Sequence, residues 1–315
     1  MKWILPEIQK RIDDAIPPGS VVTAHNDQGH FYQVMTPDED GNVGMVYRSV
    51  TDKLQVVKDE SLITFKMNRS LDYVFQHWAE FSEQNVMEHL DKARRASVDI
   101  MEDAGDIGRD VHKYRENYFK DWIKNGKAPE DIINYIPPEQ EDIRAVSALR
   151  ALHQFCDDYH YQPIRTELFV YSHKMKLGGT LDDIGFTWMK DREGNSECQH
   201  ELIESATRNF VNCVKCDFRY RIYLTLMDIK TSNQFKDHYF FQVALYKWMF
   251  YKLVGLRPQK CLIVKLSKVD GTYQVEDLKR PAMVASYARS MVRTNNGLQF
   301  IRELRKNNQK RVITI

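Results

Sequence analysis

The chain lacks any long apolar run and contains little cysteine. None of its 315 residues belongs to an apolar stretch of about 18 residues, so we expect no transmembrane helix. The first residues, Met-Lys-Trp-Ile-Leu-Pro-Glu, lack the apolar core of a signal peptide. The five cysteines are an odd number, which argues against a secreted disulfide framework. These absences predict a cytoplasmic protein without a membrane partner.

The chain also lacks a strong excess of one charge. A formal net charge of +1 gives no global attraction to nucleic acid. Locally, nine Lys and Arg between Lys279 and Arg311 stand against one acid, Glu303. This segment either tracks a phosphate backbone or is the solvated face of a C-terminal helix. The candidate nucleic-acid-binding residues within it are Arg289, Arg293, Arg302 and Arg305.

The composition is that of a packed globular protein, with 43% hydrophobic and 28% charged residues. We find no internal repeat and no low-complexity tract. The patterns divide the chain into a small β-rich N-terminal domain (residues 1–70) and a larger domain (residues 71–315). Within the larger domain, residues 192–220 form a polar insertion.

The N-terminal domain is predicted to be a helix followed by a small antiparallel sheet or barrel. Asn26-Asp27-Gln28-Gly29 and Asp38-Glu39-Asp40-Gly41-Asn42 supply the turns. This domain is either a partner-binding or DNA-positioning module or a packing appendage. The expected elements are a helix at Pro6–Ile16 and strands at Val21–Ala24, Phe31–Met35, Val43–Arg48 and Leu62–Lys66.

Residues 71–160 are predicted to be helical and the remainder mixed. Helical spacing of apolar residues follows Gly105-Asp106-Ile107-Gly108 and ends at Gly126, and a second helix starts at Pro137-Pro138. The pattern then changes to the period of two that is typical of strands. The expected later elements are strands Ile164–Tyr171, Leu177–Met189, Ile222–Ile229, Lys260–Leu266 and Thr272–Val275, and a helix at Asn233–Leu253.

The strand that ends in Asp228-Ile229-Lys230 carries the strongest chemical signal. Residues i and i+2 of a strand point to one face, so Asp228 and Lys230 project together and Ile229 projects away. A carboxylate beside an ammonium suits metal-dependent phosphodiester hydrolysis, because the acid holds the metal and the lysine meets the water or the phosphate charge. Alone, the pattern is more typical of a solvated charge pair.

Three further elements accompany this triplet. Gly178-Gly179-Thr180-Leu181-Asp182-Asp183 offers a second acid, and either Asp182 or Asp183 is the one that points at the site. Gln242 and Tyr246 share one helix face at i and i+4. His112 lies on the amphipathic helix before them, where an imidazole would favour Mn²⁺.

The order of these elements resembles the PD-(D/E)XK nuclease superfamily, and in particular its RecB-type exonuclease branch of phage and bacteria. The resemblance covers about residues 90–270. It implies an α/β fold with a mixed sheet flanked by helices, a restriction-endonuclease-like core. It also implies that His112, Asp182, Asp228 and the Ile229 carbonyl bind one or two Mg²⁺ or Mn²⁺ ions.

The resemblance assigns further roles. Lys230 would be the catalytic lysine, and Gln242 and Tyr246 would support the site and contact DNA near the scissile phosphate. Glu167 matches a frequent glutamate of the branch. Leu181 replaces the proline that names the superfamily, and only Cys261 lies near the C-terminus, so we predict no iron–sulfur cluster.

The insertion contains a candidate structural zinc site. Cys198-Gln199-His200 and Cys213-Val214-Lys215-Cys216 offer four ligands, which would fill a tetrahedral Zn²⁺ shell. The candidate zinc ligands are Cys198, His200, Cys213 and Cys216, in a zinc-ribbon-like turn. The alternative is a disordered loop whose cysteines are there by chance.

The resemblance therefore implies a Mg²⁺- or Mn²⁺-dependent DNA exonuclease that acts on ends or single strands in recombination, repair or viral replication, with other replication or recombination proteins as partners. One alternative is a structure-specific endonuclease of the same superfamily, acting on branched DNA or RNA. Another is a non-catalytic nucleic-acid-binding protein.

Overall fold

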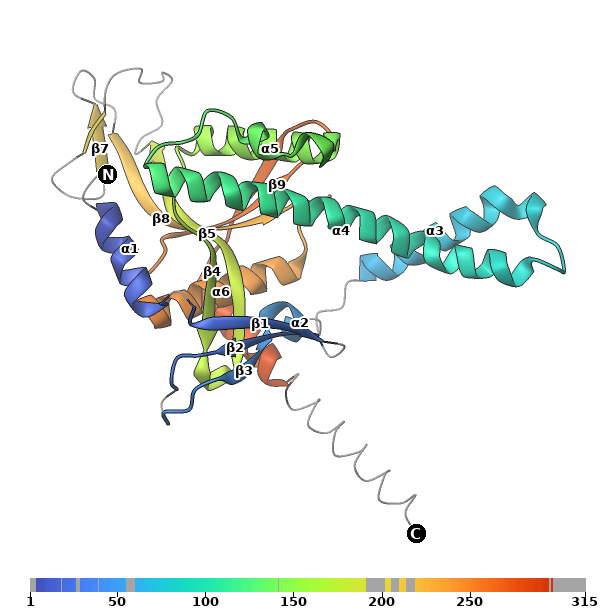
Figure 1. The fold of residues 1–315 in the computed structure, drawn as a ribbon, viewed down its shortest axis with the longest axis horizontal. Helices are drawn as coiled ribbons and strands as arrows, with labels where there is room; N and C mark the ends of the chain where they lie inside the picture. Colours follow the sequence, from blue (N-terminus) through green and yellow to red (C-terminus); the bar gives the residue numbers. More distant parts are fainter. Residues whose placement is uncertain are drawn as a thin grey trace, which may run out of the picture.

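A computed structural model describes residues 4–17, 19–26, 29–38, 40–54, 60–140, 142–190, 202–204, 210–213, 219–294 and 296. These residues form an α/β fold in which helices flank both faces of one mixed sheet (Figure 1). The expected mixed sheet flanked by helices is therefore confirmed.

The described strands all belong to this sheet. Its main path runs β1-β2-β3-β5-β8-β7-β6, while β4 pairs with β5, and β9 pairs with β8 and β10. The ten described strands are β1 (Val21–Asn26), β2 (Gly29–Val34), β3 (Met45–Ser49), β4 (Gln162–Ser172), β5 (Leu177–Lys190), β6 (Leu202–Glu204), β7 (Phe210–Cys213), β8 (Arg219–Lys230), β9 (Lys260–Leu266) and β10 (Tyr273–Asp277).

Helices connect and cover these strands. The α-helices are α1 (Ile4–Ala15), α2 (Val50–Leu54), α3 (Glu60–His77), α4 (Val86–Asn125), α5 (Ile143–Asp158) and α6 (Asp237–Val254). Short 3₁₀ turns are η1 (Trp78–Glu80), η2 (Ile132–Tyr135), η3 (Pro138–Gln140) and η4 (His173–Met175). Residues 281–294 are also helical.

The centre of the sheet is built from β4, β5, β8 and β9. β4 and β5 are antiparallel, as are β5 and β8, and β8 and β9 are parallel. Parallel neighbours need a long crossover connection, and α6 supplies it between β8 and β9. These strands lie close to their predicted bounds. Both of their faces are buried against helices, so apolar residues run almost without interruption along β9.

Two apolar cores lie on opposite faces of the sheet. The first packs α1, α2 and α6 against the sheet, and the second packs α4 and α5 against it. Strand β8 shows the alternation: Leu224 and Leu226 join the first core, and Met227 and Ile229 join the second. Asp228 and Lys230, near the end of β8, therefore lie on a strand that is packed against both cores.

Two local predictions about helices were wrong. Leu62–Lys66, expected as a strand, lies inside α3. Gly105 and Gly108, expected to precede a helix, lie inside α4, which ends as predicted with Gly126 in the left-handed conformation (φ 69°). Gly108 packs closely, because a Cβ there would lie 3.2 Å from the Thr231 hydroxyl.

The N-terminal segment shares its sheet and core with the rest of the chain. Strand β3 pairs with β5 in parallel, through Arg48 with Leu177 and Ser49 with Gly178. Ile12 from α1 and Leu54 from α2 lie in the same core as α6. The boundary at residue 70 stays a prediction about domain organisation, but β1, β2 and β3 do not form a sheet of their own.

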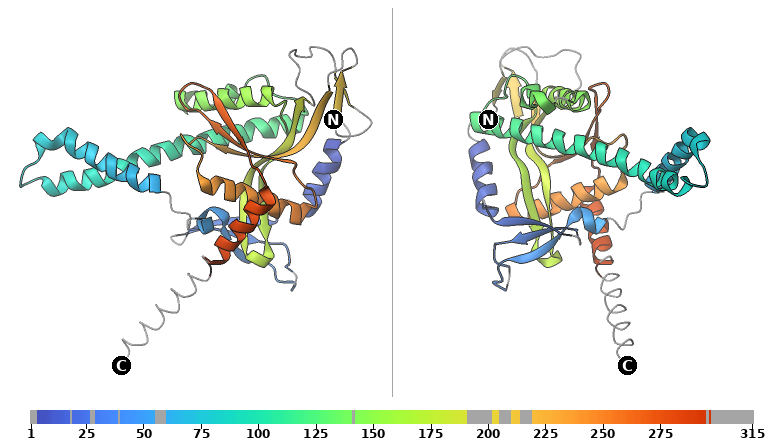
Figure 2. Two further views of the ribbon diagram at one scale, coloured as in Figure 1. Left: turned by 180° about the vertical axis from the view of Figure 1, so that it is seen from behind. Right: turned by 45° about the vertical axis from the view of Figure 1, so that its right-hand side comes forward.

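Helix α3 and the first part of α4 form an arm that projects from the body of the molecule (Figures 1 and 2). Along α3 and η1, Ile63, Met67, Leu71, Phe75 and Trp78 are all exposed. Their spacing of four, four, four and three residues places them on one side of the helix. The described part of the chain thus carries an uncovered apolar stripe, which we call the arm stripe.

Candidate metal centre and basic groove

The candidate site lies where strands β5 and β8 run side by side. Met227 pairs with Asp183, so Asp228 and Asp182 are the next residues across the two antiparallel strands. The backbone N–H of Ile229 donates to Oδ2 of Asp182 at 2.6 Å. The strand register thus joins two acids that are 46 positions apart in the sequence.

Asp182 also lies beside two residues from other elements. One ligand atom each from His112 on α4, Glu167 on β4 and Asp182 lie within 4.8 Å of one another. Nδ1 of His112 is 3.5 Å from Oδ1 of Asp182. Ligands on opposite sides of one divalent ion, each at about 2.0–2.5 Å, lie about 4–5 Å apart. These three residues, the metal group, fit one ion.

The donor set of the metal group also fits such an ion. Two carboxylates and one imidazole suit Mg²⁺ or Mn²⁺, with the imidazole favouring Mn²⁺. Burial lowers the pKa of His112 to about 4, so its ring is neutral near pH 7, as a ligand must be. Glu167 has an unusual backbone φ of 50°, a conformation that is rare for a residue with a Cβ.

A buried arginine holds the carboxylates in place. Arg115, three residues after His112 on α4, has no exposed side-chain surface. Its guanidinium lies 2.6 Å from Oδ2 of Asp183 and donates to Oε1 of Glu167. Burial alone would lower the pKa of Arg115, but these carboxylates outweigh it and raise that pKa. The site thus contains a fixed internal counter-ion.

The contacts of Arg115 distinguish the two candidate acids, Asp182 and Asp183. Asp183 is fully buried against the guanidinium, whereas Asp182 belongs to the metal group. We did not expect Arg115 from the sequence, although a signal was present. It follows Val111 by four residues and therefore falls on the apolar stripe of the helix, where a charge needs a buried partner.

Asp228 and Lys230 project together, as the strand period predicts. Nζ of Lys230 lies 2.7 Å from Oδ2 of Asp228, so the two side chains form an ion pair. The ammonium also lies 5.1 Å from the centre of the Tyr239 ring. Asp228 is adjacent to the metal group but is not one of its three residues. Burial raises the pKa of Asp228 to about 6.

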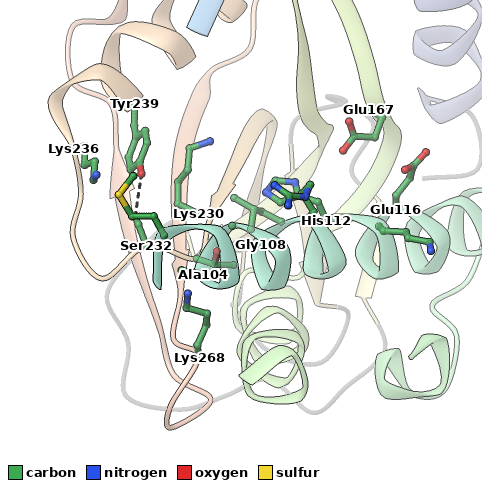
Figure 3. Close-up of a pocket in the computed structure, with 16 residues that line it drawn as sticks. Ala104, Gly108, His112, Glu116, Glu167, Lys230, Ser232, Lys236, Tyr239 and Lys268 are labelled. Carbon is green, nitrogen blue, oxygen red and sulfur yellow. Dashed lines mark hydrogen bonds between the residues drawn. The ribbon is translucent and has the colours of Figure 1, made fainter. Parts of the chain in front are cut away.

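The metal group opens into a groove of about 740 Å³ between α4, the end of β8 and the start of α6. His112, Glu167 and Lys230 lie along it (Figure 3). Its cationic side chains, Arg109, Lys113, Lys230, Lys236 and Lys268, outnumber its acids, Glu116 and Glu167. We call it the basic groove. Its charge suits a phosphate chain more than a neutral substrate.

Gln242 and Tyr246 are in contact but lie outside the residues that line the basic groove. Nε2 of Gln242 donates to the Tyr246 hydroxyl at 3.0 Å, and Tyr246 is buried in the core. A Cβ on Gly179 would lie 2.7 Å from the Tyr246 ring. Gly179 is therefore needed for the close approach of this ring, so the geometry supports a packing role for Tyr246, with half-buried Gln242 in contact with its hydroxyl.

The remaining predicted residues fall in different places. Ile229 lines the basic groove. Arg289 is half-buried with its guanidinium 4.9 Å from the centre of the Trp248 ring, and Arg293 is exposed. Cys198, His200, Cys216, Arg302 and Arg305 lie outside the described residues, as does the side chain of Cys213. The zinc site and the C-terminal half of the basic segment therefore stay predictions.

No protein-family model matches the chain, and no curated protein is found to be similar to it. None of the helices in the described ranges is both long and apolar enough to cross a bilayer.

Proposed function

We propose that this protein is a Mg²⁺- or Mn²⁺-dependent deoxyribonuclease, and that it acts as an exonuclease on DNA ends or single strands. The observation that supports the proposal most directly is the position of the metal group. His112, Glu167 and Asp182 converge on one point beside the Asp228–Lys230 ion pair, and the point opens into the basic groove. The order of the motifs, which resembles that of the RecB-type branch, also supports it.

Each residue has a role in this proposal. The metal group, with Asp228 beside it, would hold the ion, which when bound supplies an activated water and neutralises charge on the scissile phosphate. Asp228 and Asp182 keep Lys230 protonated, because they outweigh its burial and raise its pKa. Its ammonium is therefore placed to hold the attacking water or the developing charge on phosphate.

Neighbouring residues hold the carboxylates of the metal group in position. Arg115 fixes Glu167 through a direct hydrogen bond, so the carboxylate keeps its place without a metal. The Ile229 N–H fixes Asp182. Cationic side chains along the basic groove would hold the phosphates that flank the scissile bond.

Cleavage of end-labelled linear DNA and of closed circular DNA, with Mg²⁺ or Mn²⁺, tests the proposal. We expect linear DNA to be degraded from its ends and circular DNA to survive. Lys230→Ala should lower kcat by about 100-fold or more, as loss of one charge-stabilising donor does. The matched control is Lys124→Ala, an exposed lysine near the end of the same α4 that carries His112.

Three outcomes would lead to different conclusions. Cleavage of the circle would replace the exonuclease with an endonuclease. Binding without cleavage by the metal-loaded chain would favour the non-catalytic alternative. Activity that survives Lys230→Ala would remove the assigned role of this lysine.

A further inference from the structure

A second basic cavity lies outside the groove just described. It has a volume of about 570 Å³ and lies between α6 and the helical segment 281–294. It is lined by five cationic residues and no acid, together with the rings of Trp248 and Tyr251. The cationic residues are Lys247, Lys252, Arg257, Arg280 and Arg289. We call it the α6 cavity.

Two arginines of the α6 cavity lie over its two aromatic rings. The Arg257 guanidinium lies 4.9 Å from the centre of the Tyr251 ring, and Arg289 stands at the same distance from Trp248. Guanidinium groups held over rings leave N–H donors at the ring edge. Cationic donors for phosphates beside partly exposed aromatic rings are what single-stranded nucleic acids bind.

Helix α6 connects this cavity with the basic groove. Lys236 and Tyr239, at its start, line the groove, whereas Lys247 and Tyr251 line the cavity. The 12 residues from Tyr239 to Tyr251 span about 18 Å at 1.5 Å each. That length matches about five stacked nucleotides at about 3.4 Å each.

We propose that the α6 cavity binds a nucleotide of the same DNA strand whose phosphates occupy the basic groove, a few nucleotides from the scissile bond. The inference rests on the proposed function for the identity of the ligand. Such a subsite would make the affinity for single-stranded DNA depend on strand length, because a strand of two nucleotides cannot reach from the basic groove to the α6 cavity.

Binding of a fluorescent 15-nucleotide single strand, followed by anisotropy without a divalent ion, tests this proposal. Lys252→Ala/Arg257→Ala should raise Kd about tenfold and make the slope of log K against log salt shallower by about 1.4, the value for two lost contacts to single-strand phosphates. A dinucleotide should bind both proteins equally. The control, Arg94→Ala/Arg95→Ala, removes the same charge from exposed residues of the arm.

Failure of this inference is distinct from failure of the proposed function. An unchanged Kd and salt slope in the cavity variant would overturn the subsite, even if the wild-type chain cleaves DNA. A weakened and less salt-dependent complex would support the subsite, even if the chain cleaves nothing. An equal effect of the arm control would mean that only net charge matters, which also overturns it.

The arm stripe carries a second and independent inference. Its five residues are each 46–77% exposed, so together they present on the order of 500 Å² of apolar surface. A standard interface buries about 800 Å² per partner, of which about 60% is apolar. The stripe therefore supplies roughly the apolar share of one complete interface.

We infer that the arm stripe is covered by the arm of a second copy of this chain. Residues 63–101 carry five basic and six acidic side chains, so two arms face each other without net repulsion. Two helical hairpins that meet along such stripes form a four-helix bundle, and twofold symmetry closes it. A charged partner would find no complementary field on this surface.

Sedimentation velocity of the full chain tests this pairing. The wild-type chain should be a dimer, and Met67→Glu/Phe75→Glu a folded monomer with unchanged helical circular dichroism. Val43→Glu/Val269→Glu places two glutamates on apolar residues that are 56% and 89% exposed outside the arm stripe, and it should leave the dimer intact. A wild-type monomer at all concentrations, or a dimer that survives the arm substitutions, would overturn the inference.

Discussion

The strongest structural prediction concerns Arg115. Arg115→Met keeps most of the side-chain volume but removes the guanidinium from a position with no solvent exposure. Asp183, which is also fully buried, and Glu167 then lose their cation. Removing one partner of a buried ion pair costs about 3–5 kcal/mol. We therefore expect the free energy of unfolding to fall by about that amount.

Arg144 provides a matched comparison. It too pairs with two carboxylates, those of Asp103 and Asp142, but its side chain is 39% exposed. Pairs in contact with water contribute about 0–1 kcal/mol, so Arg144→Met should cost far less than Arg115→Met. Urea denaturation of the wild-type chain and the two variants, followed by circular dichroism, measures both changes.

A double substitution isolates the ion pair from the packing of the arginine stem. In Arg115→Met/Asp183→Asn neither charge remains, so the loss should be smaller than the sum of the single losses by about 1–3 kcal/mol. If Arg115→Met costs no more than Arg144→Met, or if the two single losses simply add, Arg115 is not the counter-ion that holds the carboxylates together.

Three further predictions address pH, packing and metal content. Burial raises the pKa of Glu167 from 4.5 to about 7, so within that window the folded chain keeps a proton that the unfolded chain has released. The contribution of Glu167 to stability therefore falls as pH rises through the window, and metal binding strengthens. Glu167→Gln should make the fall in the free energy of unfolding with pH shallower than in the wild-type chain, as urea unfolding at about pH 5 and about pH 7.5 would show, and equal slopes in both proteins would contradict it. Gly179→Ala should lower the free energy of unfolding by about 1–3 kcal/mol in the same assay, because its Cβ would lie 2.7 Å from the Tyr246 ring; a loss below that of a surface substitution would count against this packing. Cys213→Ser should remove bound zinc from the purified chain, measured by elemental analysis, and a wild-type chain without zinc would end the zinc hypothesis.

Much of the central sheet could be predicted from the sequence alone. Strands β5, β8 and β9 lie within a few residues of their predicted bounds, because each is a strongly patterned apolar segment bounded by polar residues. The same patterns correctly predict that Asp228 and Lys230 share a face. The N-terminal region was harder, since short amphipathic segments such as Leu62–Lys66 satisfy helix and strand patterns alike.

The sequence by itself determined which residues are candidates for the chemistry: a histidine on a helix, an acid on each of two strands, and a lysine two residues after the second acid. Local periodicity suffices for this, because it depends only on neighbours along the chain. Only the tertiary structure decided which of these residues meet. Strand register places Asp182 beside Ile229, and helix packing brings His112 and Arg115 onto Glu167 and the two aspartates. Such contacts join residues far apart in the chain, so they follow from packing rather than from any local pattern.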